Sequence, residues 1–118
     1  MEKLKGISWH AITQEQQLEE IMARSFEKPV AIFKHSIRCG LSAMVKSQLE
    51  SEWDLPEEEL EVYYLDLISY RPISNKVAKI TAVPHQSPQI IVLKDGEVQF
   101  HTSHSAISVR NVRKALAA

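Results

Sequence analysis

The sequence predicts an α/β protein whose central sheet is mixed and carries helices on both faces. Short apolar runs at 30–33 and 62–67 each precede a stretch with the three- and four-residue spacing of an amphipathic helix. Asp95-Gly96, the strongest short signal for a hairpin turn, separates two further apolar runs. Strands separated by helices pair in parallel, whereas a tight hairpin needs an antiparallel pair. We therefore expect the order βαβαβαββα in three layers, α/β/α.

The first half of the chain supplies two strands and two helices. A first strand is expected at 9–12, and Thr13 with Gln16 forms a capping box for a helix whose apolar side holds Leu18, Ile21, Met22 and Phe26. After Pro29, the run 30–33 is typical of a strand covered on both faces. A loop over 34–38 then leads to a helix that begins at or just after Cys39 and ends before Pro56. Its expected inner face is Leu41, Met44, Val45, Leu49 and Trp53.

The second half adds a strand at 62–67, a short helix, a hairpin and a last helix. Pro72 suits a first helical turn, and the inner face of that helix is expected to be Ile73, Val77 and Ile80. The hairpin strands are expected at 89–93 and 98–102. Ser105 is the expected cap of the last helix, in which Val109, Val112 and Leu116 face inward.

Length and composition exclude several classes of protein. We expect one domain over 1–118, because 118 residues leave no room for a second core. With 14 basic and 15 acidic side chains, we expect no general affinity for nucleic acid or anionic membranes. The apolar runs are far shorter than the roughly 20 residues that span a bilayer. MEKLKGISWH lacks the apolar core of a signal peptide, so we expect a cytoplasmic protein.

The only cysteine, Cys39, lies where a helix is expected to start. Free N–H groups and the helix dipole favour a thiolate there, the form that attacks disulfides. From 30 to 49 the chain has basic residues but no Asp or Glu, and we expect Arg38 to be the cation nearest the sulfur. Gly40 and Ser42 are the other expected thiolate-stabilising residues, although Ser42 can equally be only a small residue on the helix. The alternative is a buried, inert cysteine.

The arrangement of these motifs resembles thioredoxin over essentially the whole chain. A cysteine starts a helix after a buried strand, and "SPQIIVLKDGEV" is similar to the thioredoxin segment in which a cis proline precedes the hairpin. The resemblance implies a cis Ser87–Pro88 peptide rather than one at Pro84. Thioredoxins carry Cys-x-x-Cys, whereas this chain has "CGLS", with Ser42 in place of the second thiol.

A narrower resemblance is to the monothiol bacilliredoxins, on "FKHS-x-x-C-x-x-S" followed by "H-x-SPQ". It implies that Cys39 is the reactive thiol and that Ser42 replaces a resolving cysteine. It also implies a substrate-facing loop at Ser87 and Pro88, which Gln86 flanks. That family commonly has proline where this chain has Gly40, which leaves the first helical turn less constrained.

This resemblance implies thiol–disulfide exchange by one cysteine, which removes bacillithiol from S-thiolated cytoplasmic proteins. Bacillithiol is then a co-substrate, and no tightly bound cofactor is expected. Glutathione or another low-molecular-weight thiol is not excluded by any residue. We expect a monomer or a weak dimer. Two other hypotheses remain: a binding module that holds an extended peptide at the Pro88 loop with Cys39 incidental, and a redox sensor that is modified at Cys39 without turnover.

The histidines do not form an obvious metal site. His101 and His104 have a spacing that ligands can have, and His85 is near in sequence, but no carboxylate or thiol completes a set. We expect no metal. His35, four residues before Cys39, could form a Cys-His pair, but a place at the strand end is the preferred interpretation.

Overall fold

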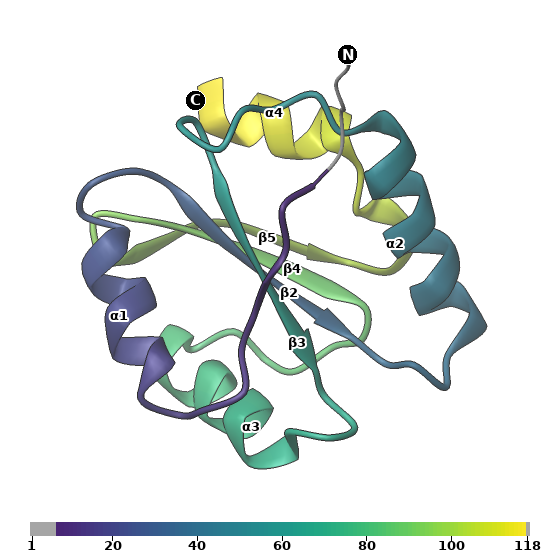
Figure 1. Ribbon diagram of the computed structural model, residues 1–118, viewed down its shortest axis with the longest axis horizontal. Helices are drawn as coiled ribbons and strands as arrows, with labels where there is room; N and C mark the ends of the chain where they lie inside the picture. Colours follow the sequence, from purple (N-terminus) through teal and green to yellow (C-terminus); the bar gives the residue numbers. More distant parts are fainter. Residues whose placement is uncertain (1–6, 118) are drawn as a thin grey trace.

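The computed structural model describes residues 7–117. The first six residues belong to the stretch that we expect not to be a signal peptide, and they lie outside the described residues. Helices and strands alternate along the chain until the final hairpin (Figure 1). The elements are β1 His10–Ala11, α1 Gln17–Arg24, β2 Val30–His35, α2 Gly40–Glu52, β3 Glu61–Asp66, α3 Arg71–Thr81, β4 Gln89–Lys94, β5 Glu97–Ser103, a 3₁₀ turn η1 His104–Ala106, and α4 Val109–Ala117.

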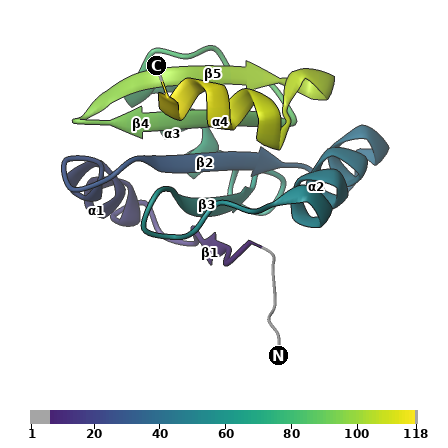
Figure 2. The ribbon, with the colours of Figure 1, turned by 90° about the horizontal axis from the view of Figure 1, so that it is seen from above.

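The five strands form one sheet in the order β1-β3-β2-β4-β5, which Figure 2 shows from above. β1 pairs with β3 and β3 with β2 in parallel, whereas β4 is antiparallel to both β2 and β5. The predicted element order and the mixed sheet are confirmed. Within residues 7–117, no helix is both long enough and apolar enough to cross a membrane.

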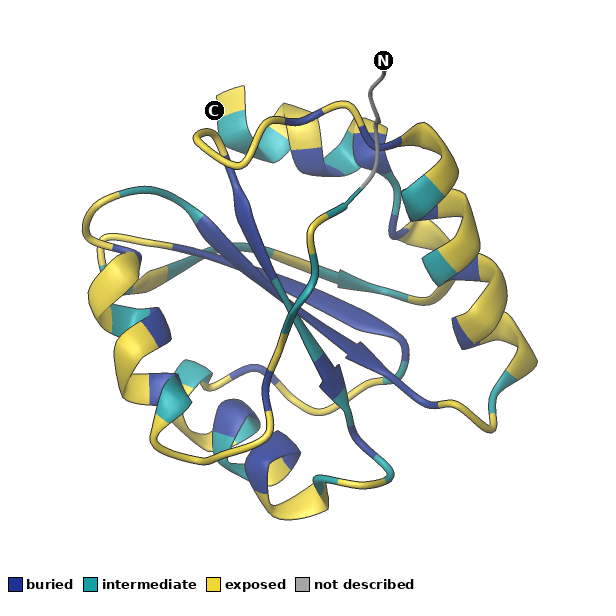
Figure 3. Cartoon of the chain, in the orientation of Figure 1, coloured by how far each residue is buried: buried dark blue, intermediate teal, exposed yellow. Residues whose placement is uncertain are grey.

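Each face of the sheet has its own hydrophobic core, as the alternation of side chains along a strand requires. Phe33 packs toward α2 and α4, and its neighbour Ile32 packs toward α1 and α3. The two pairs of helices lie on opposite sides of the sheet (Figure 1). Every residue of β2 is buried, so the central strand is covered on both faces, as predicted (Figure 3).

β2 extends two residues beyond its predicted end. Lys34 and His35, which the sequence places in a loop, continue the ladder and are buried. Lys34 pairs with Leu65 and with Gln89, and His35 pairs with Asp66. Ladder hydrogen bonds to two neighbouring strands therefore overrule the local preference of polar residues for a loop.

Two helices begin later than predicted, at Gln17 and at Val109. Thr13 does not cap α1; instead the Gln17 side-chain oxygen accepts the backbone N–H groups of Thr13 and Gln14 at 2.7 and 2.9 Å. Ser105 lies in η1, and the hydroxyl of Ser108 accepts the N–H of Asn111 at 3.0 Å. Both predicted caps were therefore wrong.

Several apolar residues expected to face inward are exposed instead. They are Phe26, Leu41, Met44 and Ile80, with exposed fractions of 64, 38, 66 and 40%. The Phe26 ring lies against the hairpin turn, where Gly96 has φ of 76° and a Cβ at residue 96 would stand 2.5 Å from the ring. The turn therefore requires glycine for its backbone angle and for the close approach of the ring.

Candidate functional site

Cys39 is the N-cap residue of α2, at the end of the sheet where β2 finishes. Its backbone is extended, with φ of −109° and ψ of 119°, and its side chain is partly exposed. Its N–H donates to the carbonyl of Ser36 at 3.2 Å, and its carbonyl accepts the N–H of Ala43 at 3.1 Å. The first N–H groups of α2 have no acceptor within the helix, so this position favours a negative charge on sulfur. The predicted place of Cys39 at a helix start is confirmed.

The turn that carries Cys39 is built around Ser36. The Ser36 carbonyl accepts the N–H of Cys39, and the Ser36 hydroxyl accepts the N–H of Arg38 at 3.3 Å. The N–H of Ser36 itself donates to the hydroxyl of Ser42 at 3.1 Å. Three hydrogen bonds thus fix the path of the backbone from the end of β2 to the reactive position.

Ser42 anchors this turn from the interior of the protein. Its side chain is fully buried, and its hydroxyl lies 2.7 Å from His35 Nδ1 as well as 3.1 Å from the Ser36 nitrogen. Both contacts join the first turn of α2 to the end of β2. The structure therefore places Ser42, predicted as a partner of the thiolate, in a hydrogen-bonded network that anchors the Cys39 turn.

His35 is the centre of this network. Burial lowers the pKa of His35, and the nearby Lys46 ammonium lowers it further, while Asp66 opposes both. A neutral imidazole is therefore favoured, with Nδ1 engaged by Ser42. The ring lies near those of Phe33 and Tyr64, at centroid distances of 6.0 and 5.5 Å. The Cys-His pair considered from the sequence is thus a His-Ser pair in the structure.

The two cations near the turn, Lys46 and Arg38, have different surroundings. Lys46 pairs with Glu50 at 2.7 Å and lies over the rings of Trp9 and Tyr64. Burial works to raise the pKa of Glu50, but hydrogen bonds from Lys46 and Trp9 outweigh it and lower that pKa. Lys46 is therefore compensated locally. Arg38, the residue before Cys39, is exposed.

The Ser87–Pro88 loop leaves the same end of the sheet. Its peptide bond is cis, the isomer predicted for it. Gln89 pairs with Lys34, so Pro88 falls at the register position beside His35, next to the strand that leads into the Cys39 turn. Pro88 is buried and its carbonyl accepts the N–H of His104 at 3.0 Å, whereas Gln86 is exposed. The Ser87 hydroxyl is buried and, among the described residues, has no partner.

Gly40 is the first residue of α2, and a Cβ placed there would meet no atom within 4 Å. Proline fits a first helical position because that N–H has no acceptor in the helix, and Cys39 already has the extended backbone that a following proline requires. We expect Gly40→Pro to raise the free energy of unfolding by about 0.5 to 1 kcal/mol, by restricting the unfolded chain. Urea denaturation measures this. Gly96→Pro is the contrasting variant, because φ of 76° forbids proline there and stability should fall.

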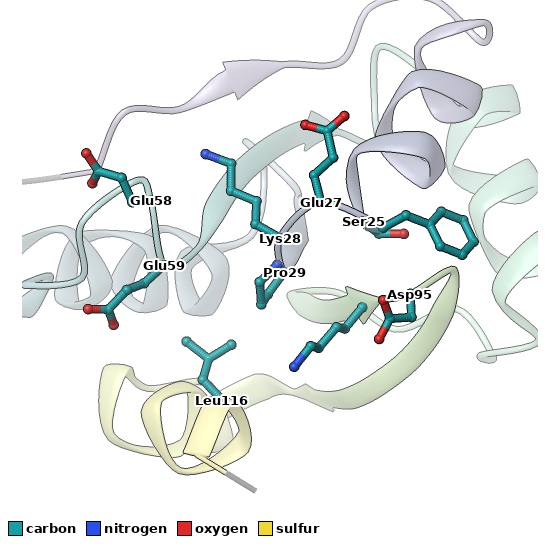
Figure 4. Close-up of a pocket in the computed structure, with 10 residues that line it drawn as sticks. Ser25, Glu27, Lys28, Pro29, Glu58, Glu59, Asp95 and Leu116 are labelled. Atoms are coloured by element: carbon teal, nitrogen blue, oxygen red, sulfur yellow. The ribbon is translucent and has the colours of Figure 1, made fainter.

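Two further clusters lie away from the Cys39 turn. His10, Glu57 and Glu61 bring potential metal ligands within 4.8 Å of one another, but Glu61 already accepts hydrogen bonds from Arg24 at 3.2 Å and Tyr63 at 2.6 Å. A hollow of about 400 Å³ opens beside Lys28 and Pro29, before the start of β2 (Figure 4). It is therefore at the opposite end of the central strand from Cys39.

Sequence reasoning missed the buried polar residues of this end of the sheet. The sequence predicts a loop over 34–38, with His35 at the strand end, and a strand at 89–93, yet Lys34, His35, Ser36 and Gln89 are all buried. The available signal was the alternation of β2 continued past Phe33, which assigns Lys34 to the face of Ile32 and His35 to the face of Phe33.

Comparisons with known proteins agree with this geometry. Residues 10–112 match the family described as "Monothiol bacilliredoxin BrxC". A solved structure described as having a thioredoxin fold is 30% identical, with a TM-score of 0.78 over 91% of this chain and 92% of that one. Thioredoxin of Malassezia sympodialis is 17% identical, with a TM-score of 0.70 over 96% and 90% of the two chains. Spinach chloroplast thioredoxin F is 16% identical, with a TM-score of 0.68 over 99% and 96%.

The match covers most of the chain, and the fold of these structures is that of the protein described above. Together they support a thiol–disulfide redox function for a chain whose one cysteine starts a helix. The chain belongs to the monothiol bacilliredoxin family and has the thioredoxin-like fold that its sequence predicts.

Proposed function

We propose that the protein removes bacillithiol, or a similar small thiol, from mixed disulfides on cytoplasmic proteins. The observation that carries the proposal is a single, partly exposed cysteine at the N-terminus of α2, at the same end of the sheet as a cis-proline loop. Membership of the bacilliredoxin family supports the choice of thiol.

The exchange takes two steps that conserve electrons. The Cys39 thiolate attacks the small-thiol sulfur of the mixed disulfide, forms a Cys39–small thiol disulfide, and releases the protein thiolate, which takes up a proton. The thiolate of a second small-thiol molecule then attacks the small-thiol sulfur of the adduct. The symmetrical disulfide is released, and the Cys39 thiolate is restored. Because the chain has no second cysteine, this outside thiol must complete the cycle.

Intact-protein mass spectrometry tests both steps. The reduced protein is incubated with a bacillithiolated protein substrate, and we expect one bacillithiol adduct per chain, together with free substrate thiol. Reduced bacillithiol should then remove the adduct. Cys39→Ser is the control and should gain no mass. Failure of the wild-type chain to acquire the adduct from bacillithiolated protein would refute the proposal.

The rate of the second step separates this function from a redox sensor. An enzyme-like protein should lose the adduct to bacillithiol fast enough for repeated turnover, with substrate thiol accumulating beyond one equivalent per chain. Release that stops at one equivalent would favour the sensor hypothesis. Oxidised glutathione in a parallel incubation shows whether the small thiol is selected.

A further inference from the structure

Lys34 is a buried ammonium whose described hydrogen-bond partners carry no negative charge. The residue is fully buried on the α1 and α3 side of the sheet, where its neighbours along β2 are apolar. Its Nζ donates to the carbonyl of Ser74 at 3.1 Å and lies 3.4 Å from His85 Nδ1. Burial lowers the pKa of Lys34 to about 8, so it remains mostly charged at neutral pH. Burying a charge without an opposite charge is costly, so we expect Lys34 to lower the stability of the fold.

The carboxylate at the end of the neighbouring strand does not supply the missing charge. Asp66 pairs with His35 in the ladder, so it belongs to the opposite face of the sheet from Lys34. Its oxygens accept hydrogen bonds from the N–H of Ile68 and the hydroxyl of Ser69. The other charged residue near His85 is Arg71, which is also positive. Burial lowers the pKa of His85, and the charges of Lys34 and Arg71 lower it further.

Two unpaired polar atoms belong to the segment that pairs with Lys34. Gln89 is the ladder partner of Lys34 and is 1% exposed; its Nε2 donates to the Pro84 carbonyl at 3.0 Å, while its Oε1 is buried without a described partner. The Ser87 hydroxyl is unpaired in the same way. These atoms are suited to a ligand that brings a carboxylate for Lys34 and Ser87 and an adjacent N–H or O–H for Gln89 Oε1.

The group lies at the same end of the sheet as the reactive thiol. Lys34 is five residues before Cys39, and Ser87 and Gln89 enclose the cis-proline position of the loop at the same end of the sheet. His85 is exposed and its Nδ1 lies 3.4 Å from Lys34 Nζ, so a carboxylate that displaced the imidazole would take its place beside the ammonium. Cys39 starts α2, so a small thiol bonded to it would extend across this end of the sheet to place an acidic group there.

We propose that Lys34, with Arg71, Ser87 and Gln89, forms an anion subsite that receives a carboxylate of the small thiol exchanged at Cys39. The inference rests on the proposed function, since it concerns the molecule held in the Cys39 adduct. It implies that residues on the α3 side of the loop determine which small thiols react faster. Small disulfides that carry carboxylates should therefore react faster than neutral ones.

The rate of adduct formation with two disulfides tests the subsite. Glutathione disulfide carries carboxylates, and bis(2-hydroxyethyl) disulfide carries none. We expect Lys34→Met to slow adduct formation with the first by about tenfold, as loss of a charged hydrogen bond does, and to leave the second within about twofold. Lys79→Met, at an exposed position of the same helix as Arg71, is the matched control and should change neither rate. Equal slowing with both disulfides would overturn the subsite.

A binding measurement that needs no reaction separates the two proposals. Succinate is titrated into Cys39→Ser protein while the side-chain amide signals of Gln89 are followed by NMR, and we expect a saturable shift that Lys34→Met abolishes. If the wild-type chain acquires no adduct from bacillithiolated protein, the proposed function fails and this titration alone decides the subsite. If Lys34→Met does not fold, Arg71→Gln replaces it, with a smaller loss toward glutathione disulfide only. Absence of any succinate shift would refute the subsite.

Discussion

Ser42→Ala is expected to lower the free energy of unfolding by about 1 to 3 kcal/mol, the cost of leaving buried polar groups unpaired. The Ser42 side chain is fully buried and hydrogen-bonded to the N–H of Ser36 and to His35 Nδ1. Alanine suits a helix, so the loss comes from the network and not from helix propensity. Urea denaturation measures the change. The Cys39 turn should also loosen, and adduct formation should slow.

Ser47→Ala is the matched control, because Ser47 lies in the same helix but is exposed. Its effect on stability should stay within about 0.5 kcal/mol. The pair also separates two roles for Ser42. A hydroxyl that only donated to the thiolate would, on removal, slow adduct formation and leave stability unchanged, and that result would contradict the anchoring role.

Lys34→Met is expected to raise the free energy of unfolding at pH 7 by about 1 to 3 kcal/mol, because methionine has a similar length and no charge to bury. The Ser74 carbonyl that loses the lysine lies inside α3, where helical N–H groups are available to it. The same variant that weakens the proposed subsite should therefore be the more stable protein. Such a trade between stability and function is common at binding sites.

The gain from Lys34→Met should depend on pH in a defined direction. The pKa of Lys34 falls from 10.5 in the unfolded chain to about 8 in the folded protein because of burial. Below pH 8 the amine is charged in both states and the cost of burial is complete. Between pH 8 and 10.5 the unfolded chain binds more protons, so the wild-type protein gains stability as the pH rises.

Urea denaturation at pH 7 and pH 9.5 should therefore show a smaller advantage of Lys34→Met at the higher pH. Lys79→Met should show no such change, because Lys79 is exposed. A Lys34→Met protein that is less stable than wild type at both pH values would show that the ammonium stabilises the fold through Ser74 and His85.

The arrangement of strands was predictable because its signals are local. The apolar run before Cys39 and the Asp95-Gly96 turn fix two strands and a hairpin without reference to the rest of the chain. The beginnings of α1 and α4 were not predictable in the same way. Gln17 accepts the N–H groups of Thr13 and Gln14 before α1, and Ser108 rather than Ser105 accepts an N–H at the start of α4. Which of these polar side chains is used depends on the folded backbone.

In the candidate site, too, local sequence patterns predict some features, whereas others depend on long-range pairing. The position of Cys39 follows from a strand followed by a helix, which the sequence displays. The burial of Lys34 and His35 follows from pairing with β3 and β4, which lie far away in sequence. Their polar side chains favour a loop. No local pattern therefore predicts that Ser42 hydrogen-bonds to His35 or that Gln89 pairs with Lys34. The partners of Ser42 were therefore visible only in the structure.

A chain with Cys39 as its one sulfhydryl obeys a particular stoichiometry. Forming its disulfide from a symmetrical disulfide releases one small thiol, so the oxidised fraction follows the ratio of disulfide to thiol to the first power. A protein with two such groups that closes an internal bridge releases two, and its oxidised fraction depends on the absolute thiol concentration as well. Dilution of the thiol pool at a constant ratio would thus shift a two-cysteine protein and leave this one unchanged.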